Sequence, residues 1–431
     1  MEKPREESQI LEDLTTLAGS PGYVHAVAHI CHRDNVIHIK GKLKPSDMDR
    51  LFSRERLIRT ELTTLIGLMV KKPLDLSQQP TDVTEGYVKR TDALLQELHN
   101  SMSYPMFASM FDAVKAGATP PNPWHGPGMR EPIFYGTESA YAFQYRDLVP
   151  EKYGADDAWM LKNKGFTSGQ ARTIAKTMCA LMDEKGTRLL ADTRTAIAPP
   201  VTWLPAFEFS LDEVAFHSGV EKDIVEAFFR AFLFTGDNSG FKEVGDFNEV
   251  AARPLLPTDR GTVLLFSHYA IYEALYESPF FWMWDDKAYR PTAAKHRGVF
   301  TEQFAARRLA GVFGHEHVYA NVNLHRGKDI VGEADVLVIY GDRSFCRRRL
   351  RSSPSLRARE TITSLKPTSL LPSKIRMIKA GHARTNCLPV DVGWWTTTRK
   401  KSCFHPASKR SSCSALCRNT IRHWPFRQAS P

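Results

Sequence analysis

Two carboxylates, Glu333 and Asp335, open the segment of the chain whose residue types could do chemistry. They stand directly before an apolar, β-branched run at residues 336–340, and the Gly341–Asp342 pair after it is a turn signal. The pattern predicts one arm of a β-hairpin with acidic side chains at its start. Carboxylates so placed can hold a divalent cation. Taken alone, however, a Glu-x-Asp before a strand is more often a strand opening without catalytic meaning.

The composition of the chain changes abruptly at about Arg343. Residues 344–431, here called the tail, contain 19 Lys and Arg against two acidic residues, whereas residues 1–343 contain 39 against 46. The formal charge of +10 therefore combines −7 before the break with +17 in the tail. A basic tail can neutralise the phosphates of nucleic acid. Its crowding of Arg among Ser, Pro and Leu is also typical of a GC-rich gene translated out of frame.

The codons of the tail favour the second interpretation. When the third base of each codon is read with the first two of the next, Met377-Ile378 forces Asp and Trp394-Trp395 forces Val. The same shift from Ser344 onward permits Val-Leu-Gln-Ala-Lys-Thr-Lys-Lys-Leu-Thr, which is protein-like. We therefore predict a frameshift near codon 343. We also predict a disordered tail, because it combines high net charge with no persistent hydrophobic period.

When the codons from Ser344 onward are read in the shifted frame, the segment that contains Asp335 resembles the PD-(D/E)XK (restriction-endonuclease-like) nuclease superfamily. Within that superfamily it resembles the nuclease-related NERD-like bacterial proteins. The resemblance rests on Gly-Glu-x-Asp-Val-Leu at residues 332–337 followed by Gln-Ala-Lys, and it covers residues 296–343. It implies a parent protein that is a Mg²⁺-dependent nuclease acting on nucleic acid, with DNA as the first choice of substrate.

The resemblance also implies roles for individual residues. Asp335 would be a catalytic metal ligand, and Mg²⁺ held there would polarise the scissile phosphate and lower the pKa of a bound water. Glu302, in the preceding helical segment, stands where the family places a further carboxylate ligand. It could equally be a first-turn Glu that complements the helix dipole. Glu333 is a weaker catalytic candidate.

The second half of the expected site is missing from the polypeptide as written. In the restored frame a Gln would be a second ligand, and the Lys two residues later would position the attacking water and offset developing charge. Cys346, Arg347 and Arg348 stand in their places, so we expect this chain to be inactive. The alternative is a non-catalytic binding or regulatory scaffold with a degenerate nuclease-like core. A Gln or Glu and a Lys encoded after residue 343 would favour the enzyme.

The fold class predicted for the chain is α+β, with a helical N-terminal region before a truncated restriction-endonuclease-like α/β core and the tail. The predicted divisions are a mixed strand and helix region at 1–120, an aromatic-rich linker and helix at 121–200, a helix-turn-helix-like module at 201–257, the first half of the core at 258–343 and the disordered tail at 344–431. Within them, helices are expected at 82–99, 168–184 and 271–276, and a strand at 261–266.

Residues 23–30 and 35–39 are predicted to be two strands around a His-Arg-Asp turn. Histidine and cysteine side chains gather there: His25, His29, Cys31, His32 and His38. Zinc binding is an alternative, but strand alternation would send these side chains to opposite faces, and no Cys-x-x-Cys pair accompanies them. We therefore prefer a half-exposed strand pair.

Residues 211–228 have the spacing of a helix-turn-helix. Ala215 is small, Gly219 stands at the turn four residues later, and Ser210 is a plausible N-cap. A DNA reader would need basic or amide side chains at the start of the second helix, where Glu221 and Asp223 are acidic. The segment is therefore expected to be a structural helix pair.

The remaining composition indicates the cellular compartment of the protein. Cys31 and Cys179 are the two cysteines before the break, and such usage suits a reducing compartment without a disulfide framework. No window of about 18 apolar residues occurs, and the N-terminus lacks the apolar region of a signal peptide. We expect a soluble cytoplasmic protein with no membrane partner. A basic loop at 294–298 could meet phosphates.

Overall fold

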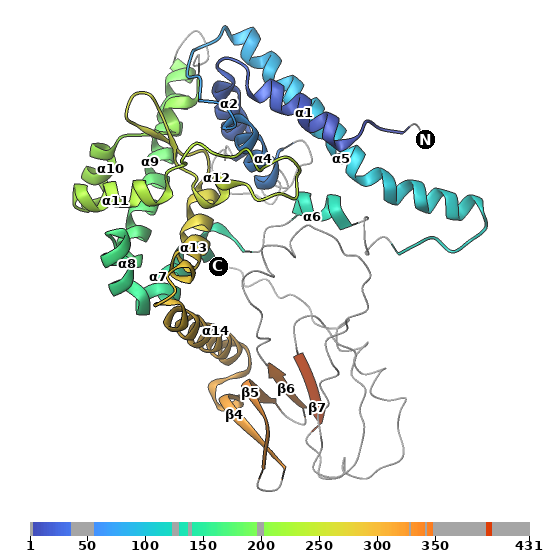
Figure 1. Cartoon of the computed structure of the whole chain (residues 1–431), viewed down its shortest axis with the longest axis vertical. Coiled ribbons are helices and arrows are strands. Elements are labelled where there is room, and N and C mark those ends of the chain that lie inside the picture. Colours follow the sequence, from blue (N-terminus) through green and yellow to red (C-terminus); the bar gives the residue numbers. More distant parts are fainter. Residues whose placement is uncertain are drawn as a thin grey trace. The chain divides into compact units, whose positions relative to one another are not determined.

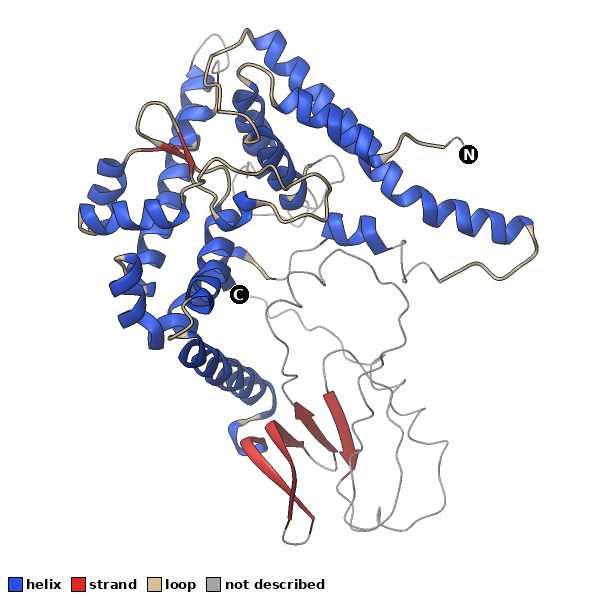
Figure 2. Cartoon of the chain, viewed as in Figure 1, coloured by secondary structure: helices blue, strands red, loops and turns tan. Residues whose placement is uncertain are grey.

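The structure is a computed structural model of the 431-residue chain. It describes residues 3–35, 56–122, 129–136, 140–195, 202–326, 329–340, 343–347 and 394–398. The described chain is mostly helical with two small antiparallel sheets (Figures 1 and 2), which agrees with the predicted α+β class. It divides into two compact units. The described parts are residues 3–297, called the helical unit, and residues 298–347 with 394–398, called the sheet unit.

The helical unit begins with α1 (Glu7–Ala18), α2 (Tyr23–Asn35), α4 (Arg59–Met69) and α5 (Thr81–Lys115). Helix α1 is amphipathic, since Ile10, Leu11 and Leu14 lie on one buried stripe. Helix α5 confirms the helical pattern predicted at residues 82–99 and continues it to Lys115. The long helix α5 lies along α1 in the upper part of Figure 1.

Helix α2 corrects the prediction of a strand at residues 23–30. Its buried side chains, among them Val24, Ala26, Val27, Ala28 and Ile30, run continuously along the sequence. A continuous apolar run cannot be assigned to strand or helix from its period. Because α2 is surrounded by other elements of the unit, its burial on nearly every side favours a helix over the strand propensity of its Val and Ile. The second predicted strand lies outside the described residues after position 35.

The middle of the helical unit is formed by α6 (Arg130–Gly136), α7 (Ala142–Tyr153), the 3₁₀ turn η2 (Gly154–Asp156), α8 (Asp157–Lys164) and α9 (Ser168–Thr195). Helix α9 confirms the helix predicted at 168–184. Its first turn is capped by a carboxylate, because the Ser168 backbone N–H donates to Asp157 at 2.6 Å. The adjacent Phe166 ring is fully buried in the core.

The predicted helix-turn-helix is confirmed as the helix pair α10 (Leu211–Ser218) and α11 (Lys222–Phe232). The Ser210 hydroxyl accepts the Glu213 backbone N–H at 3.2 Å and so caps α10. Gly219 ends α10 with φ +64°, the left-handed conformation that glycine adopts without a steric cost.

A small sheet and a long helix complete the helical unit. The elements are η3 (Leu204–Ala206), β1 (Glu208–Phe209), α12 (Glu249–Ala252), β2 (Leu256–Pro257), β3 (Val263–Leu264) and α13 (His268–Asp285), and the sheet order is β1-β3-β2. The strand predicted at 261–266 is present but shorter, and the helix predicted at 271–276 is part of α13. Leu264, Ile271 and Leu275 are fully buried in the same core as α1 and α2. Residues 258–297 therefore belong to the helical unit rather than to the predicted nuclease-like core.

A buried amide network fixes the loop before α12 against α4. Asn238 Nδ2 donates to the Gly67 carbonyl at 2.8 Å, and Asn248 Nδ2 donates to the Thr63 carbonyl at 2.8 Å. The two amides also bond to each other at 3.1 Å. A Cβ added at Gly67 would lie within 3.0 Å of three atoms of the Asn248 amide. Glycine at this position is what allows the loop to approach the helix.

The sheet unit follows α14 (Arg290–Phe313), which begins in the helical unit. It contains the 3₁₀ turn η4 (His315–His317) and the strands β4 (Val318–Arg326), β5 (Asp329–Tyr340), β6 (Arg343–Arg347) and β7 (Trp394–Thr398). The strands form one antiparallel sheet in the order β4-β5-β6-β7. The basic segment predicted as a loop at 294–298 lies inside α14, because apolar residues such as Ala293 recur at helical spacing around it.

Two strands lie in the tail, which was predicted to have no fold. β6 includes Ser344 to Arg347, and β7 consists of two Trp followed by three Thr. Aromatic and β-branched residues favour extended backbone, so for these residues the prediction from net charge missed a local strand propensity. The rest of the tail lies outside the described residues.

Candidate functional site

Strand β5 presents Asp335 on its more accessible face. Ala334, Val336 and Val338 are fully buried, whereas Asp335 between them is half-buried. Such alternation is expected of a strand with one face against a core. The β5 backbone therefore directs the Asp335 carboxylate away from the buried face, to a side on which it could bind a cation.

Strand β6 forms the second arm of the hairpin predicted after Asp335. It pairs antiparallel with β5, and its last residue, Arg347, stands opposite Val336. The second arm was predicted only for the restored frame, so a β6 made of tail residues corrects the prediction that the tail has no fold. The pairing ends at Val336, one residue short of Asp335. In this chain Cys346, Arg347 and Arg348 stand where the resemblance expects Gln-x-Lys, and Arg348 lies outside the described residues.

Glu302 lies in α14, the helix that precedes the sheet. Its side chain is half-buried and interacts with other groups, as does that of Asp335. The far end of the helix meets the strand, since the rings of Phe313 and Tyr340 have centroids 5.6 Å apart. Glu302 is about 16 Å before Phe313 along the helix axis, and Asp335 is about 17 Å before Tyr340 along the strand. The ring contact shows only that α14 and β5 meet at their C-terminal ends.

Glu333 stands two residues before Asp335 on β5, opposite Asn323 of β4.

Asn321 of β4 is a residue that the sequence analysis missed. It follows Ala320, which pairs with Val336, and so stands across the ladder from Asp335. Its φ of 53° makes it the non-glycine residue with positive φ in the described part of the chain. Asn tolerates this conformation better than most residues, and an amide oxygen is an acceptable ligand for hard cations. The available signal was an Asn in the middle of a strand, where this residue type is depleted.

The donors of this region do not complete a magnesium site. Mg²⁺ prefers oxygen ligands in octahedral geometry, and Cys346 and Arg347 supply none from their side chains. Within the described ranges, no group of three or more His, Cys, Asp and Glu side chains is arranged to hold a metal. The chain as written therefore presents Asp335 without the second-strand partners that the chemistry requires.

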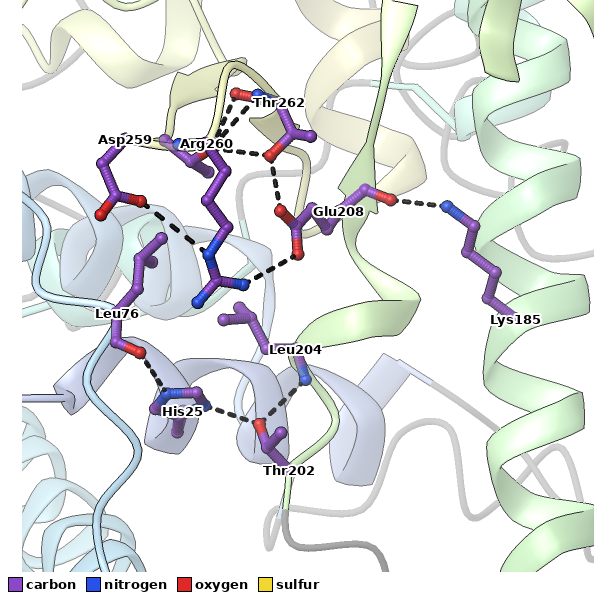
Figure 3. Close-up of polar contacts among 10 residues, drawn as sticks. His25, Leu76, Lys185, Thr202, Leu204, Glu208, Asp259, Arg260 and Thr262 are labelled. Atoms are coloured by element: carbon purple, nitrogen blue, oxygen red, sulfur yellow. Dashed lines mark hydrogen bonds and ion pairs between the residues drawn. The ribbon is translucent and has the colours of Figure 1, made fainter. Parts of the chain in front are cut away.

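The histidines of α2 form a second polar constellation, shown in Figure 3. His25 Nε2 lies 3.2 Å from the Leu76 carbonyl oxygen, and Nδ1 lies 2.6 Å from the Thr202 hydroxyl. Because a carbonyl only accepts, Nε2 carries the proton and the Thr202 hydroxyl donates to Nδ1. Burial lowers the pKa of His25, which keeps the ring neutral. Both nitrogens are thus occupied and neither faces a metal position.

Other polar contacts near His25 link strands to helices. The Thr262 hydroxyl donates to the Glu208 carboxylate at 2.5 Å, and Lys185 of α9 donates to the Glu208 carbonyl at 2.6 Å (Figure 3). His32 stacks on Trp203 with ring centroids 3.4 Å apart. These contacts are structural, so the zinc alternative gains no support from the described histidines. His38 lies outside the described residues.

Comparisons of the chain with protein-family models, with curated proteins and with solved structures find no match. In the portion of the chain that the structure describes, no helix has the length and apolar character needed to cross a membrane.

Proposed function

We propose that the parent of this chain is a metal-dependent nuclease that cleaves nucleic acid, with DNA as the first choice, and that the frame break leaves the present chain inactive. The observation that carries the proposal is the placement of Asp335. It lies on the more accessible face of β5, the strand that pairs with β6, and this supports the proposal because the Gln-x-Lys expected in the shifted frame would be encoded at the end of β6.

The residues of the chain suit the first half of the chemistry. Asp335 would supply one carboxylate ligand, and Glu302 from α14 a second. Asn321 could orient Asp335 or add an amide oxygen, since it stands directly across the ladder. Bound Mg²⁺ would supply charge for the scissile phosphate and for the attacking water. The role of the protein is then to hold two carboxylates on rigid elements.

The residues that would complete the proposed site are lost when the reading frame shifts near codon 343. Without the Lys, the site lacks the residue expected to position the attacking water and offset charge on the phosphate, and without the Gln the ligand set is short of one oxygen. Residues that act as one unit lose activity together, commonly by orders of magnitude. We therefore expect no Mg²⁺- or Mn²⁺-dependent cleavage of linear or supercoiled DNA by this chain. Robust cleavage that Asp335→Ala abolishes would contradict this.

The decisive experiment repairs the reading frame near codon 343 and compares the two proteins. The repaired chain should cleave DNA with Mg²⁺, and Mg²⁺ should raise its melting temperature, because a ligand at about 100 times its Kd stabilises the folded state by about 2.7 kcal/mol. Asp335→Asn should remove both effects. The matched control is Asp285→Asn, which removes one exposed carboxylate from α13. A repaired chain that neither cleaves nor responds to Mg²⁺ refutes the nuclease proposal.

The second candidate is a non-catalytic binding or regulatory scaffold. The presence of Cys346, Arg347 and Arg348 where Gln-x-Lys is expected favours it. It becomes the better account if resequencing of codons 335–365 finds the present frame in the genome.

A further inference from the structure

A buried carboxylate, Asp156, is paired with a histidine in the helical unit, apart from the residues discussed above. Asp156 ends the 3₁₀ turn η2 and is 2% exposed. Its Oδ1 accepts the Tyr289 hydroxyl at 2.7 Å and lies 2.6 Å from Nδ1 of His296. Both partners come from the chain around the start of α14, so the pair joins segments that are 140 residues apart in sequence.

This pairing determines which nitrogen of the His296 ring donates a hydrogen bond. A carboxylate oxygen accepts, so Nδ1 of His296 donates to Asp156, and Nε2 is the nitrogen that can act as a base or nucleophile. The side chain is 27% exposed, whereas that of Asp156 is 3% exposed. In the described part of the chain Nε2 has no hydrogen-bond partner. The ring is therefore partly exposed, and its Nδ1 is held by a buried carboxylate.

The support behind the pair is rigid. The Tyr289 ring stacks on Trp159 with centroids 5.6 Å apart, and Trp159 Nε1 donates to Asp286 at 2.8 Å. Asp286 also accepts the Tyr289 backbone N–H at 3.1 Å. A buried carboxylate that orients an imidazole and stabilises its positive form is the arrangement that activates histidine as a base or nucleophile.

We infer that His296 is a nucleophilic imidazole of a second site, which accepts an acyl or phosphoryl group at Nε2 from a small activated donor. The Nε2 lone pair attacks the carbonyl carbon or the phosphorus. The N–C or N–P bond forms, and the bond to the leaving group breaks with its electron pair going to that group. The Nδ1 proton stays between the ring and Asp156, whose negative charge balances the cationic ring. No oxidant or reductant is required. This inference does not depend on the nuclease proposal.

The test compares histidines within one folded protein. Full-length chain is treated in one arm with diethyl pyrocarbonate, an acyl donor, and in the other with phosphoramidate, a phosphoryl donor. Modified histidines are quantified against time by peptide mass spectrometry. His217 is the internal reference, because it is exposed at the end of α10 and lacks a carboxylate partner in the described structure. His296 should react about 10 to 100 times faster than His217, the factor that a charge-assisted hydrogen bond supplies.

Two variants separate activation from mere accessibility. Asp156→Asn keeps an oxygen that can accept both hydrogen bonds but removes the charge, so it should slow modification of His296 by about tenfold or more and leave His217 unchanged. Asp285→Asn, the control for charge alone, should change neither. A purely structural His296 would react no faster than His217 in either arm, and that result overturns the inference even if Asp156→Asn fails to fold. Reaction in one arm alone identifies the group that the site takes.

Discussion

His99 of α5 should act as a charged clamp between α4 and α6, and its replacement by Leu tests this. Nε2 lies 2.9 Å from Glu61 of α4, and Nδ1 lies 3.0 Å from Glu131 of α6. Both acceptors are carboxylate oxygens, so both ring nitrogens must carry protons. Burial alone lowers the pKa of His99, but the hydrogen bonds and charges of Glu61 and then Glu131 outweigh it, so the pKa is raised.

The magnitude follows from the burial of the partners. The Glu61 side chain is 3% exposed, and its second oxygen accepts the Ile58 backbone N–H at 2.7 Å, so it cannot leave without uncapping α4. His99→Leu leaves that charge buried without its cation, which should cost about 3–5 kcal/mol. Glu131 is 27% exposed. Glu131→Gln, which keeps an acceptor oxygen, should therefore cost about 1 kcal/mol.

The pH dependence has a defined sign. Because the pKa of His99 is raised on folding, its contribution to stability is fully present below the unfolded-state value of about 6.5 and is lost as the pH rises through the folded-state value. A neutral ring can donate to Glu61 or to Glu131 but not to both. The stability difference between wild type and His99→Leu should therefore be larger at pH 6 than at pH 9.5.

Urea unfolding followed by far-UV circular dichroism measures this, since most helices belong to the helical unit. His217→Leu, which removes an exposed histidine, serves as the control and should show a flat, small difference over the same pH range. The reasoning is refuted if the His99→Leu difference is independent of pH, or grows toward pH 9.5.

Two further substitutions have clear expected outcomes. Gly67→Ala should destabilise the helical unit by about 1–3 kcal/mol in urea unfolding, because the new Cβ meets the Asn248 amide. In α5 a Cβ added at Gly86 meets nothing within 4 Å, so Gly86→Ala should instead stabilise the helical unit by about 0.5–1 kcal/mol. Equal changes in unfolding free energy for the two variants would contradict the role of the amide network. In the sheet unit, Asn321→Ala should lower the free energy of unfolding by about 1–2 kcal/mol, and Asn321→Gly by less, because φ at this position is 53°. A thermal-shift series measures both variants. If Gly is the more destabilising of the two, the Asn side chain and not the backbone conformation determines the stability.

The parts of the fold that the sequence predicted are those with a local signal. The N-cap at Ser210, the left-handed turn at Gly219 and the strand that contains Asp335 each follow from residue types within a few positions. Helix α2 was assigned to a strand because its burial comes from tertiary packing on almost all sides, which no window of sequence reveals.

The polar contacts between distant segments were beyond sequence reasoning for a different reason. The bonds from His99 to Glu61 and Glu131, and from His296 to Asp156, join residues 32 to 140 positions apart. Residue type alone does not specify such partners, since an isolated His has no pattern that points to its acceptor. For Asp335, by contrast, the strand alternation was readable from the sequence, whereas the partner strand β6 is formed by tail residues that were predicted to have no fold.

The two units differ in the apolar core that residues 1–343 supply. The continuous core of the helical unit runs from Ile10 to Ala293, and every residue in it is encoded before the break. In the sheet unit the described buried apolar side chains are few and mostly small: Ala305, Ala310, Ala334, Val336 and Val338. Because a few strands need a substantial apolar face to be stable, we expect a frameshift near codon 343 to weaken this unit most. The helical unit should then stay folded whichever proposal is correct, because the enzyme and scaffold alternatives both concern the sheet unit.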